Sequence, residues 1–274
     1  MCKWTCREID YKEEITLANY HLEGTYISRG NDRSFTKTMN YISGQKLYDC
    51  YNEETYYRGR DDVLYCKVIL PDEVPCEFSD LQYLCNKVET AAKRYDARTA
   101  REVIASLPNE LSLEENVQIV NEFVENNFLR HGLCAVVAIH EGENEKEPSK
   151  NNPHVHIIVP TRTVSSEGLN EKTYREFNKT ANVHAWREQW ANIQNQAYER
   201  NNLPMRVSHE SLEVQGIRDR EPANHLSLAS WQRERRGEHT PQGDKRRAID
   251  RRNRERTQHI LDEHSRDLNI EMER

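Results

Sequence analysis

The chain has 274 residues, of which 36% are hydrophobic and 31% are charged, and its formal net charge is −7. This length suffices for one large domain, or for a domain with an appendage, and for a sizeable core. No run of eighteen apolar residues occurs and the first residues lack an apolar signal region, so we expect neither membrane insertion nor export. The seven cysteines are scattered without zinc-finger spacing, which favours reduced thiols in the cytoplasm.

Apolar periodicity predicts alternating strands and helices. Strands are expected at 20–28, 63–70, 98–107, 134–140 and 152–159. Helices are expected at 34–43, at 79–95 with Ser79 as N-cap, at 112–129 behind a capping box that starts at Ser112, and at 183–201. The tyrosine-rich residues 46–58 form a hairpin or an irregular arm. Because strict βαβ alternation is missing, we expect an α+β fold with helices packed on an antiparallel sheet.

Basic side chains concentrate towards the C-terminus. Residues 1–150 hold 18 basic and 27 acidic side chains, whereas Trp231–Arg256 holds ten Lys or Arg against five Asp or Glu. We expect a leader at 1–16, a main domain at 17–230 and a charged, basic, helical or disordered tail at 231–274. Such a tail suits a DNA partner or a solvated helix, and charge alone favours neither.

Two histidines in the run 152–159 suggest a metal site. Side chains alternate along a strand, so His154 and His156 project from one face while the apolar residues between them face a core. His140 ends the preceding apolar run. If these two runs pair as a hairpin, the three imidazoles converge at one end of a sheet.

Three neutral imidazoles would leave the full charge of a divalent cation available to a substrate, with positions open for water or a phosphate oxygen. A bare His-X-His pair is more often an ordinary half-exposed strand. The addition of His140, with Asn152–Pro153 shaping the entry to the second strand, favours a metal site. These residues do not separate a hydrolase from a nuclease.

Tyr41, in the predicted helix 34–43, is a candidate nucleophile. A tyrosyl oxygen that attacks a phosphodiester needs help to ionise and a polarised phosphate, because a free phenol has a pKa near about 10. The phosphotyrosine ester conserves the bond energy, so a DNA strand can be nicked, held and rejoined. On local sequence alone, a buried helix aromatic is the simpler interpretation.

Six stretches, in order along residues 18–230, resemble relaxases of the MobA/MobL family, the mobilisation nucleases with a His-hydrophobe-His motif. They are Tyr20–Leu22 with Ser28–Gly30; Asn40–Asp49; Arg101–Val103 to Leu107–Pro108; Ala138–His140; Asn152–His156 with Thr161–Arg162; and Leu212–Ile217 with Glu221–Pro222 and His225–Leu226.

The resemblance implies a fold like that of HUH endonucleases, His140, His154 and His156 as metal ligands, and Tyr41 as nucleophile. Glu102 falls where the family places a carboxylate near the metal. It would orient a ligand imidazole or help to deprotonate the tyrosine, and an exposed strand carboxylate is the equally simple alternative.

Three features depart from the family pattern. Ile104 stands where relatives often carry a second acid, which leaves a two-carboxylate arrangement in doubt. The loop 141–150 is longer than usual and adds four glutamates, so we expect it to point away from DNA. The short basic tail, in place of further modules, suggests a minimal nicking protein.

The resemblance also implies the activity: metal-dependent, strand-specific nicking of single-stranded DNA at a plasmid origin of transfer, through a 5′-phosphotyrosyl link, which initiates conjugative mobilisation. Accessory mobilisation proteins and a coupling protein are the expected partners. Candidate phosphate contacts are Lys37, Lys46, Arg162 and the cluster Trp231–Arg256. Manganese, zinc and nickel suit imidazole ligands, and magnesium suits them less.

Two alternatives remain at this point. A rolling-circle replication initiator shares the chemistry and differs in the DNA site that it nicks. A non-catalytic DNA-binding protein with a structural metal would keep the fold without the reaction.

Overall fold

A computed structural model of the chain describes residues 16–31, 33–142, 151–179, 181–218, 220–224 and 226–272. The expected leader, except for its last residue, most of the acidic loop 141–150 and His225 lie outside the described residues. Contacts divide the chain into two compact units, Met1–His209 and Glu210–Arg274. This division is based on packing contacts. The boundaries that the sequence predicts for the leader, at residue 16, and for the main domain, at residue 230, therefore stay predictions.

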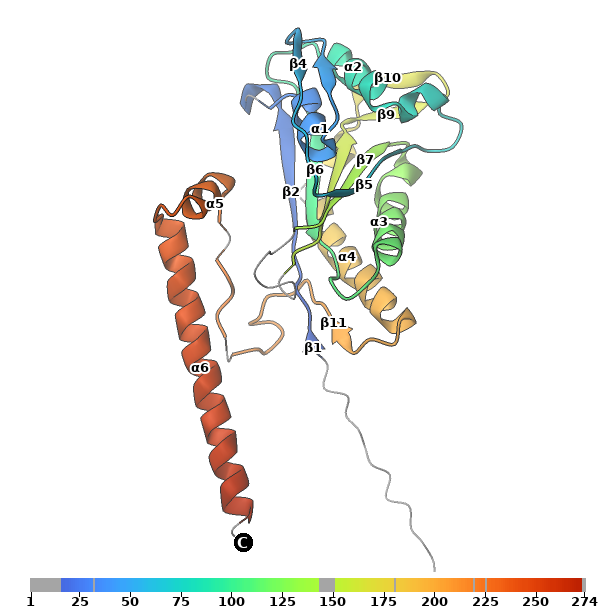
Figure 1. Ribbon diagram of the computed structural model, residues 1–274. Coiled ribbons are helices and arrows are strands. Elements are labelled where there is room, and N and C mark those ends of the chain that lie inside the picture. Colours follow the sequence, from blue (N-terminus) through green and yellow to red (C-terminus); the bar gives the residue numbers. More distant parts are fainter. Residues whose placement is uncertain are drawn as a thin grey trace, which may run out of the picture. The chain divides into compact units, whose positions relative to one another are not determined.

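Unit 1 is built on a five-stranded antiparallel sheet in the order β2-β6-β8-β7-β5 (Figure 1). The strands are β2 (Leu22–Ser28), β5 (Val63–Ile69), β6 (Arg98–Ser106), β7 (Ala135–His140) and β8 (His154–Pro160). The expected hairpin is confirmed, because β7 and β8 pair with His140 opposite His154. The α+β class with an antiparallel sheet is confirmed as well.

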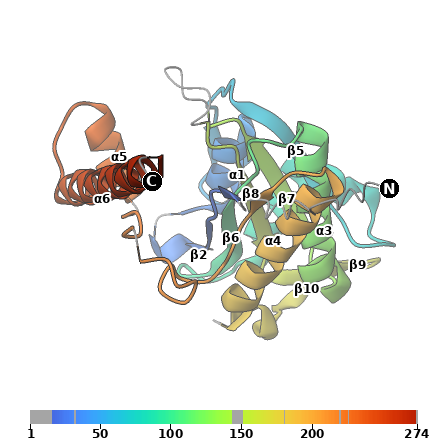
Figure 2. The same cartoon turned by 90° about the horizontal axis from the view of Figure 1, so that it is seen from below.

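Each face of the sheet has its own hydrophobic core. Helices α3 (Leu113–Asn127) and α4 (Ala181–Arg200) cover one face, where Val155, Ile157 and Val159 are buried. Helices α1 (Phe35–Ser43) and α2 (Leu81–Ala91) cover the other, where Ile158 is buried. Figure 2 shows the strands between α1 on one side and α3 with α4 on the other. Alternation along β8 therefore directs His154 and His156 towards the α1 side.

Short-range signals explain where the helices begin. Ser34 caps α1 by accepting the backbone N–H of Lys37, and Ser112 caps α3 in the same way. The N-cap predicted for α2 was wrong by one position: Asp80 accepts the N–H of Tyr83 at 2.6 Å, whereas the Ser79 hydroxyl donates to Cys76. Ser79 is not the cap because it belongs to a 3-10 turn formed by residues 76–79. The Asp80 carboxylate is also the better cap, because its negative charge suits the positive end of the helix dipole.

The described residues of unit 1 also form three small two-stranded sheets. The hairpin expected within residues 46–58 is present as β3 (Leu47–Asp49) and β4 (Glu54–Tyr56). A second hairpin, not foreseen, joins β9 (Arg162–Ser165) to β10 (Gly168–Thr173). A parallel pair joins β1 (Thr16–Leu17) to β11 (Met205–Arg206). In the described part of unit 1, 3-10 turns lie at Arg29–Asn31, Cys76–Ser79, Leu129–His131 and Arg175–Asn178.

Unit 2 contains α5 (Leu228–Arg235) and the long helix α6 (Pro241–Met272). Glu234 at the end of α5 accepts hydrogen bonds from Thr240 and Arg247 at the start of α6. Glu221 accepts hydrogen bonds from Arg252 and Arg256. Part of the basic charge of the tail is therefore neutralised within this unit. Among the described residues, no helix is long and apolar enough to cross a membrane.

Candidate active site

The sheet brings the three predicted histidines together. His140 at the end of β7 faces His154 at the start of β8, and His156 lies two residues further on the same face. Their ring centroids are 4.8–5.3 Å apart, and one nitrogen of each ring lies within 4.8 Å of the other two. Metal–imidazole bonds are about 2.0–2.1 Å long, so a shift of about 1 Å per ring brings all three nitrogens onto one ion.

Each ring is oriented by an oxygen on its outer side. His140 donates from Nε2 to the carbonyl of Ile42 at 2.8 Å, and His154 donates from Nδ1 to the carbonyl of Asn152 at 2.9 Å. His156 donates from Nδ1 to Glu102 Oε1 at 3.0 Å. Carbonyl and carboxylate oxygens only accept, so these contacts fix the tautomers and leave one lone pair free on each ring.

The donor set fits a divalent cation. The Nδ1 atom of His140 is buried and has no hydrogen-bond partner among the described residues, which is costly for a polar atom unless a ligand meets it. Burial lowers the pKa of His140 to about 4 and also lowers the pKa of His154. Both rings are therefore held in the neutral form, which is the form that binds metals.

Glu102 on β6 faces the histidines and is 5% exposed, so the exposed alternative is excluded. Its second oxygen accepts a hydrogen bond from Arg33 at 2.5 Å. Burial alone would raise the pKa of this carboxyl, but hydrogen bonds and charge from His156 and Arg33 outweigh burial and hold the pKa below its ordinary value. Glu102 is therefore an anion that orients His156.

Tyr41 lies on α1 beside the histidine cluster. The centroids of the Tyr41 and His156 rings are 6.5 Å apart, with the rings nearly perpendicular. The next residue, Ile42, supplies the carbonyl that holds His140, so one helix turn contacts the cluster through both its backbone and the tyrosine. The Tyr41 ring is half-buried.

Two arginines flank Tyr41. The guanidinium carbon of Arg60 is 4.8 Å from the centroid of the Tyr41 ring, and that of Arg58 is 5.3 Å away. Arg60 is held by an ion pair with Asp62 and by a 3.2 Å hydrogen bond to the Tyr41 carbonyl. Two cations therefore lie beside the ring of Tyr41.

The three predicted DNA contacts lie in different places. Lys37 is exposed on α1, one helical turn before Tyr41 and on the same face, and Lys46 is exposed just before β3. Arg162 lies beyond Pro160 at the opposite end of β8 from His154, and donates to the carbonyls of Ala91 and Asn170. The structure does not bring Arg162 to the histidines.

Sequence reasoning missed four residues at the site: Arg33, Arg58, Arg60 and Asp62. Lone basic or acidic residues near turns carry no periodic signal. Only the tertiary contacts reveal that they surround Tyr41 and Glu102.

Comparisons with known proteins agree with this architecture. The probable mobilization protein MobA of Bifidobacterium longum is 28% identical over 264 residues, covering 81% of this chain and 45% of that protein. The mobilization protein MobL of Acidithiobacillus ferridurans is 30% identical over 92% of this chain and 74% of its own length. This chain spans less than half of MobA and about a quarter of the conjugal transfer proteins TraA that it also matches.

A solved structure described as "Molecular Basis of Vancomycin Resistance Transfer in Staphylococcus aureus" has a similar fold. The TM-score is 0.64 with 28% identity, covering 71% of this chain and all of the other. The family model for the MobA/MobL family matches residues 33–236, which include Tyr41, Glu102 and all three histidines. The chain belongs to the MobA/MobL family.

Proposed function

We propose that the chain is a relaxase, a metal-dependent enzyme that nicks single-stranded DNA at a plasmid origin of transfer and so initiates conjugative mobilisation. The observation that carries this proposal is the position of Tyr41, whose ring lies 6.5 Å from His156 and beside a cluster of three histidines. The names of its relatives, mobilization proteins MobA and MobL, support the biological setting.

In this reaction, Tyr41 Oη attacks the scissile phosphorus in line. A bond forms between Oη and phosphorus as the phenol gives up its proton to solvent. The bond between phosphorus and the 3′-oxygen breaks, and the leaving oxygen takes up a proton from solvent to give a free 3′-hydroxyl. The protein then carries a 5′-phosphotyrosyl link. The reverse reaction rejoins the strand, because the ester conserves the energy of the original phosphodiester.

His140, His154 and His156 would hold the divalent cation, which when bound supplies a Lewis acid for a phosphate oxygen. Glu102 keeps the His156 ring in one tautomer and one orientation. An all-imidazole set suits manganese, zinc or nickel better than magnesium. Lys37 and Lys46 are proposed phosphate contacts, since both are exposed and Lys37 lies one helical turn before Tyr41 on the same face of α1.

The decisive experiment follows the covalent adduct between the protein and a labelled single-stranded oligonucleotide that contains the origin of transfer, resolved on a denaturing gel. Tyr41→Phe should abolish the adduct while DNA binding persists. Tyr83→Phe, on the adjacent helix α2, serves as the matched control and should react normally. Excess EDTA should also abolish the wild-type adduct.

An undiminished adduct in Tyr41→Phe would overturn the assignment of the nucleophile. Absence of any adduct in the metal-loaded wild-type protein would instead favour a non-catalytic DNA-binding protein. Sequencing the attached strand then distinguishes a transfer origin from a replication origin.

A further inference from the structure

The hairpin of residues 46–58, which we name the tyrosine arm, displays an unusual number of exposed aromatic rings. Tyr48 is 45% exposed, Tyr51 48% and Tyr57 73%. Among the described residues, these three are half of the large hydrophobic side chains that are exposed. Exposed apolar rings that gather on one short element indicate a binding surface.

The arm is held rigidly although its rings are exposed. The side-chain amide of Gln82 on α2 brackets the backbone of Tyr48: it accepts from the Tyr48 N–H at 2.7 Å and donates to the Tyr48 carbonyl at 2.8 Å. Gln82 is itself held by Asn86 at 3.0 Å. A ring fixed in this way loses little conformational freedom when a ligand stacks on it.

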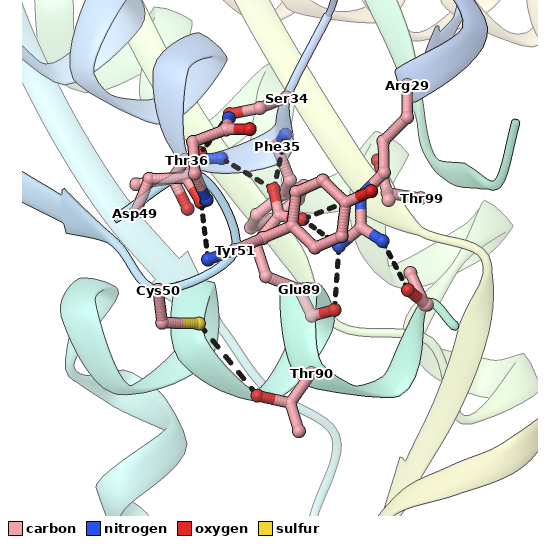
Figure 3. Close-up of polar contacts among 12 residues, drawn as sticks. Arg29, Ser34, Phe35, Thr36, Asp49, Cys50, Tyr51, Glu89, Thr90 and Thr99 are labelled. Atoms are coloured by element: carbon pink, nitrogen blue, oxygen red, sulfur yellow. Dashed lines mark hydrogen bonds and ion pairs between the residues drawn. The ribbon is translucent and has the colours of Figure 1, made fainter. Parts of the chain in front are cut away.

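Asp49 ties the turn of the arm to the helix that carries Tyr41. Its carboxylate is fully buried and accepts the backbone N–H groups of Tyr51 at 2.9 Å and Asn52 at 3.1 Å. It also accepts the hydroxyl of Ser34, the N-cap of α1, at 2.6 Å (Figure 3). The arm and α1 therefore keep a fixed relationship.

Tyr51 acts as a second anchor. The guanidinium carbon of Arg29 lies 3.5 Å from the centroid of the Tyr51 ring, and Arg29 forms a buried ion pair with Glu89. Glu89 in turn accepts the backbone N–H of Phe35 at the start of α1, at 2.8 Å (Figure 3). One face of the Tyr51 ring is thus occupied, which leaves Tyr48 and Tyr57 as the rings available to a ligand.

The arm leads directly to the candidate nucleophile. The chain leaves β4 through Tyr57 to Arg58, whose guanidinium carbon is 5.3 Å from the Tyr41 ring centroid. Arg58 is exposed and has no ion pair among the described residues. Lys37 adds a second cation, with its Nζ 5.8 Å from the ring centroid of Tyr56. The exposed ring of Tyr57 is thus next in the chain to a cation that reaches Tyr41, and Lys37 lies one helical turn before Tyr41 on α1.

We propose that the tyrosine arm is a base-stacking surface for unpaired DNA. Tyr48 and Tyr57 stack on bases of the strand beside the scissile phosphate, while Arg58 and Lys37 contact its phosphates. Proteins that bind single-stranded DNA without reading its sequence commonly combine aromatic side chains, which stack on bases, with basic side chains, which contact phosphates. This proposal rests on the proposed function and adds to it the surface that aligns the strand with Tyr41.

The test measures binding of a fluorescent oligothymidine of about twelve nucleotides by anisotropy. Tyr48→Ala and Tyr57→Ala should each weaken binding by about 5- to 150-fold, whereas Tyr48→Phe and Tyr57→Phe should retain wild-type affinity because the ring remains. Tyr95→Ala is the matched control, since Tyr95 is 79% exposed on the loop before β6 and outside the arm. It should bind like the wild type, and thermal unfolding should show that all variants fold.

A second probe, an abasic oligonucleotide of equal length and charge, separates stacking from electrostatic attraction. The alanine variants and the wild type should bind it equally, since no base is present to stack. Arg58→Gln should weaken binding to both probes. Wild-type oligothymidine affinity in folded Tyr48→Ala and Tyr57→Ala, together with normal adduct formation, would overturn the arm proposal and leave the proposed function standing. If the metal-loaded wild-type protein formed no covalent adduct with the origin oligonucleotide, the proposed function itself would be overturned.

Discussion

Glu102 joins an imidazole to a guanidinium: its Oε1 accepts from His156 at 3.0 Å and its Oε2 accepts from Arg33 at 2.5 Å. The carboxylate comes from β6, the imidazole from the neighbouring strand β8, and the arginine from the segment before α1. A single buried anion thus sets the orientation of one candidate metal ligand.

Replacing Glu102 by Ala should weaken metal binding by about 10- to 100-fold, because ligand imidazoles that lose their outer hydrogen bond are less basic and less well oriented. Competition with a chromophoric chelator, using manganese or zinc, measures the affinity without any DNA. Glu23→Ala, which removes a half-buried carboxylate on the edge strand β2, is the control. Unchanged affinity in Glu102→Ala would show that the carboxylate does not act through His156.

Replacing Glu89 by Ala should destabilise the fold by about 3–5 kcal/mol, since it leaves the buried guanidinium of Arg29 without its partner. The side chains of this pair are only 4% and 0% exposed. Urea unfolding followed by tryptophan fluorescence gives the free energy of unfolding.

The matched control for Glu89 is Glu176→Ala, which breaks the exposed ion pair with Lys179. Here the expected cost is below about 1 kcal/mol, because solvent screens such pairs. If Glu89→Ala and Glu176→Ala lowered the free energy of unfolding equally, burial would not be the reason for the importance of Glu89.

Asp80→Ala should cost about 1 kcal/mol of stability and Ser79→Ala no more than a few tenths, because only Asp80 caps α2. The same unfolding assay compares them. If Ser79→Ala lowered the free energy of unfolding more than Asp80→Ala, Ser79 would be the N-cap, as the sequence predicts.

Cysteine reactivity should follow burial. Burial raises the pKa of Cys66 to about 11 and that of Cys134 to about 12, and it also raises the pKa of Cys85. At pH 8 a thiol with a pKa of about 11 is about one-thousandth thiolate, and the thiolate is the reactive form. Iodoacetamide labelling with peptide mapping should therefore modify the exposed Cys76 well before these three. Raising the pH towards 10 should bring the labelling rate of Cys66 closer to that of Cys76 before it does so for Cys134 or Cys85, because the thiol pKa of Cys66 is the lowest of the three. Fast labelling of Cys134 in the folded protein would contradict this order.

The central sheet and the histidine positions were predictable because they depend on alternation. Along β8, period-two placement separates the histidines from Val155, Ile157 and Val159, and this pattern follows from strand geometry alone. The pairing of β7 with β8 followed from the tendency of consecutive strands to be neighbours, whereas the register that puts His140 opposite His154 is a finding of the structure.

Other parts depended on contacts between distant segments. Arg33, Arg58 and Arg60 reach the site through tertiary packing, and nothing in their local sequence distinguishes them from other surface cations. The choice of Asp80 over Ser79 depended on the preceding 3-10 turn. The position of Arg162 could not be inferred because the hairpin of β9 and β10 was not foreseen.

The parallel pairing of β1 with β11 has a mechanical consequence. Thr16 lies opposite Met205 and Leu17 opposite Arg206, so two strands near the two ends of the described part of unit 1 run side by side in the same direction. Tension applied between these two ends would load the ladder in shear, so that its hydrogen bonds would have to rupture together instead of unzipping one by one. A pair only two residues long can thus resist pulling better than its length suggests.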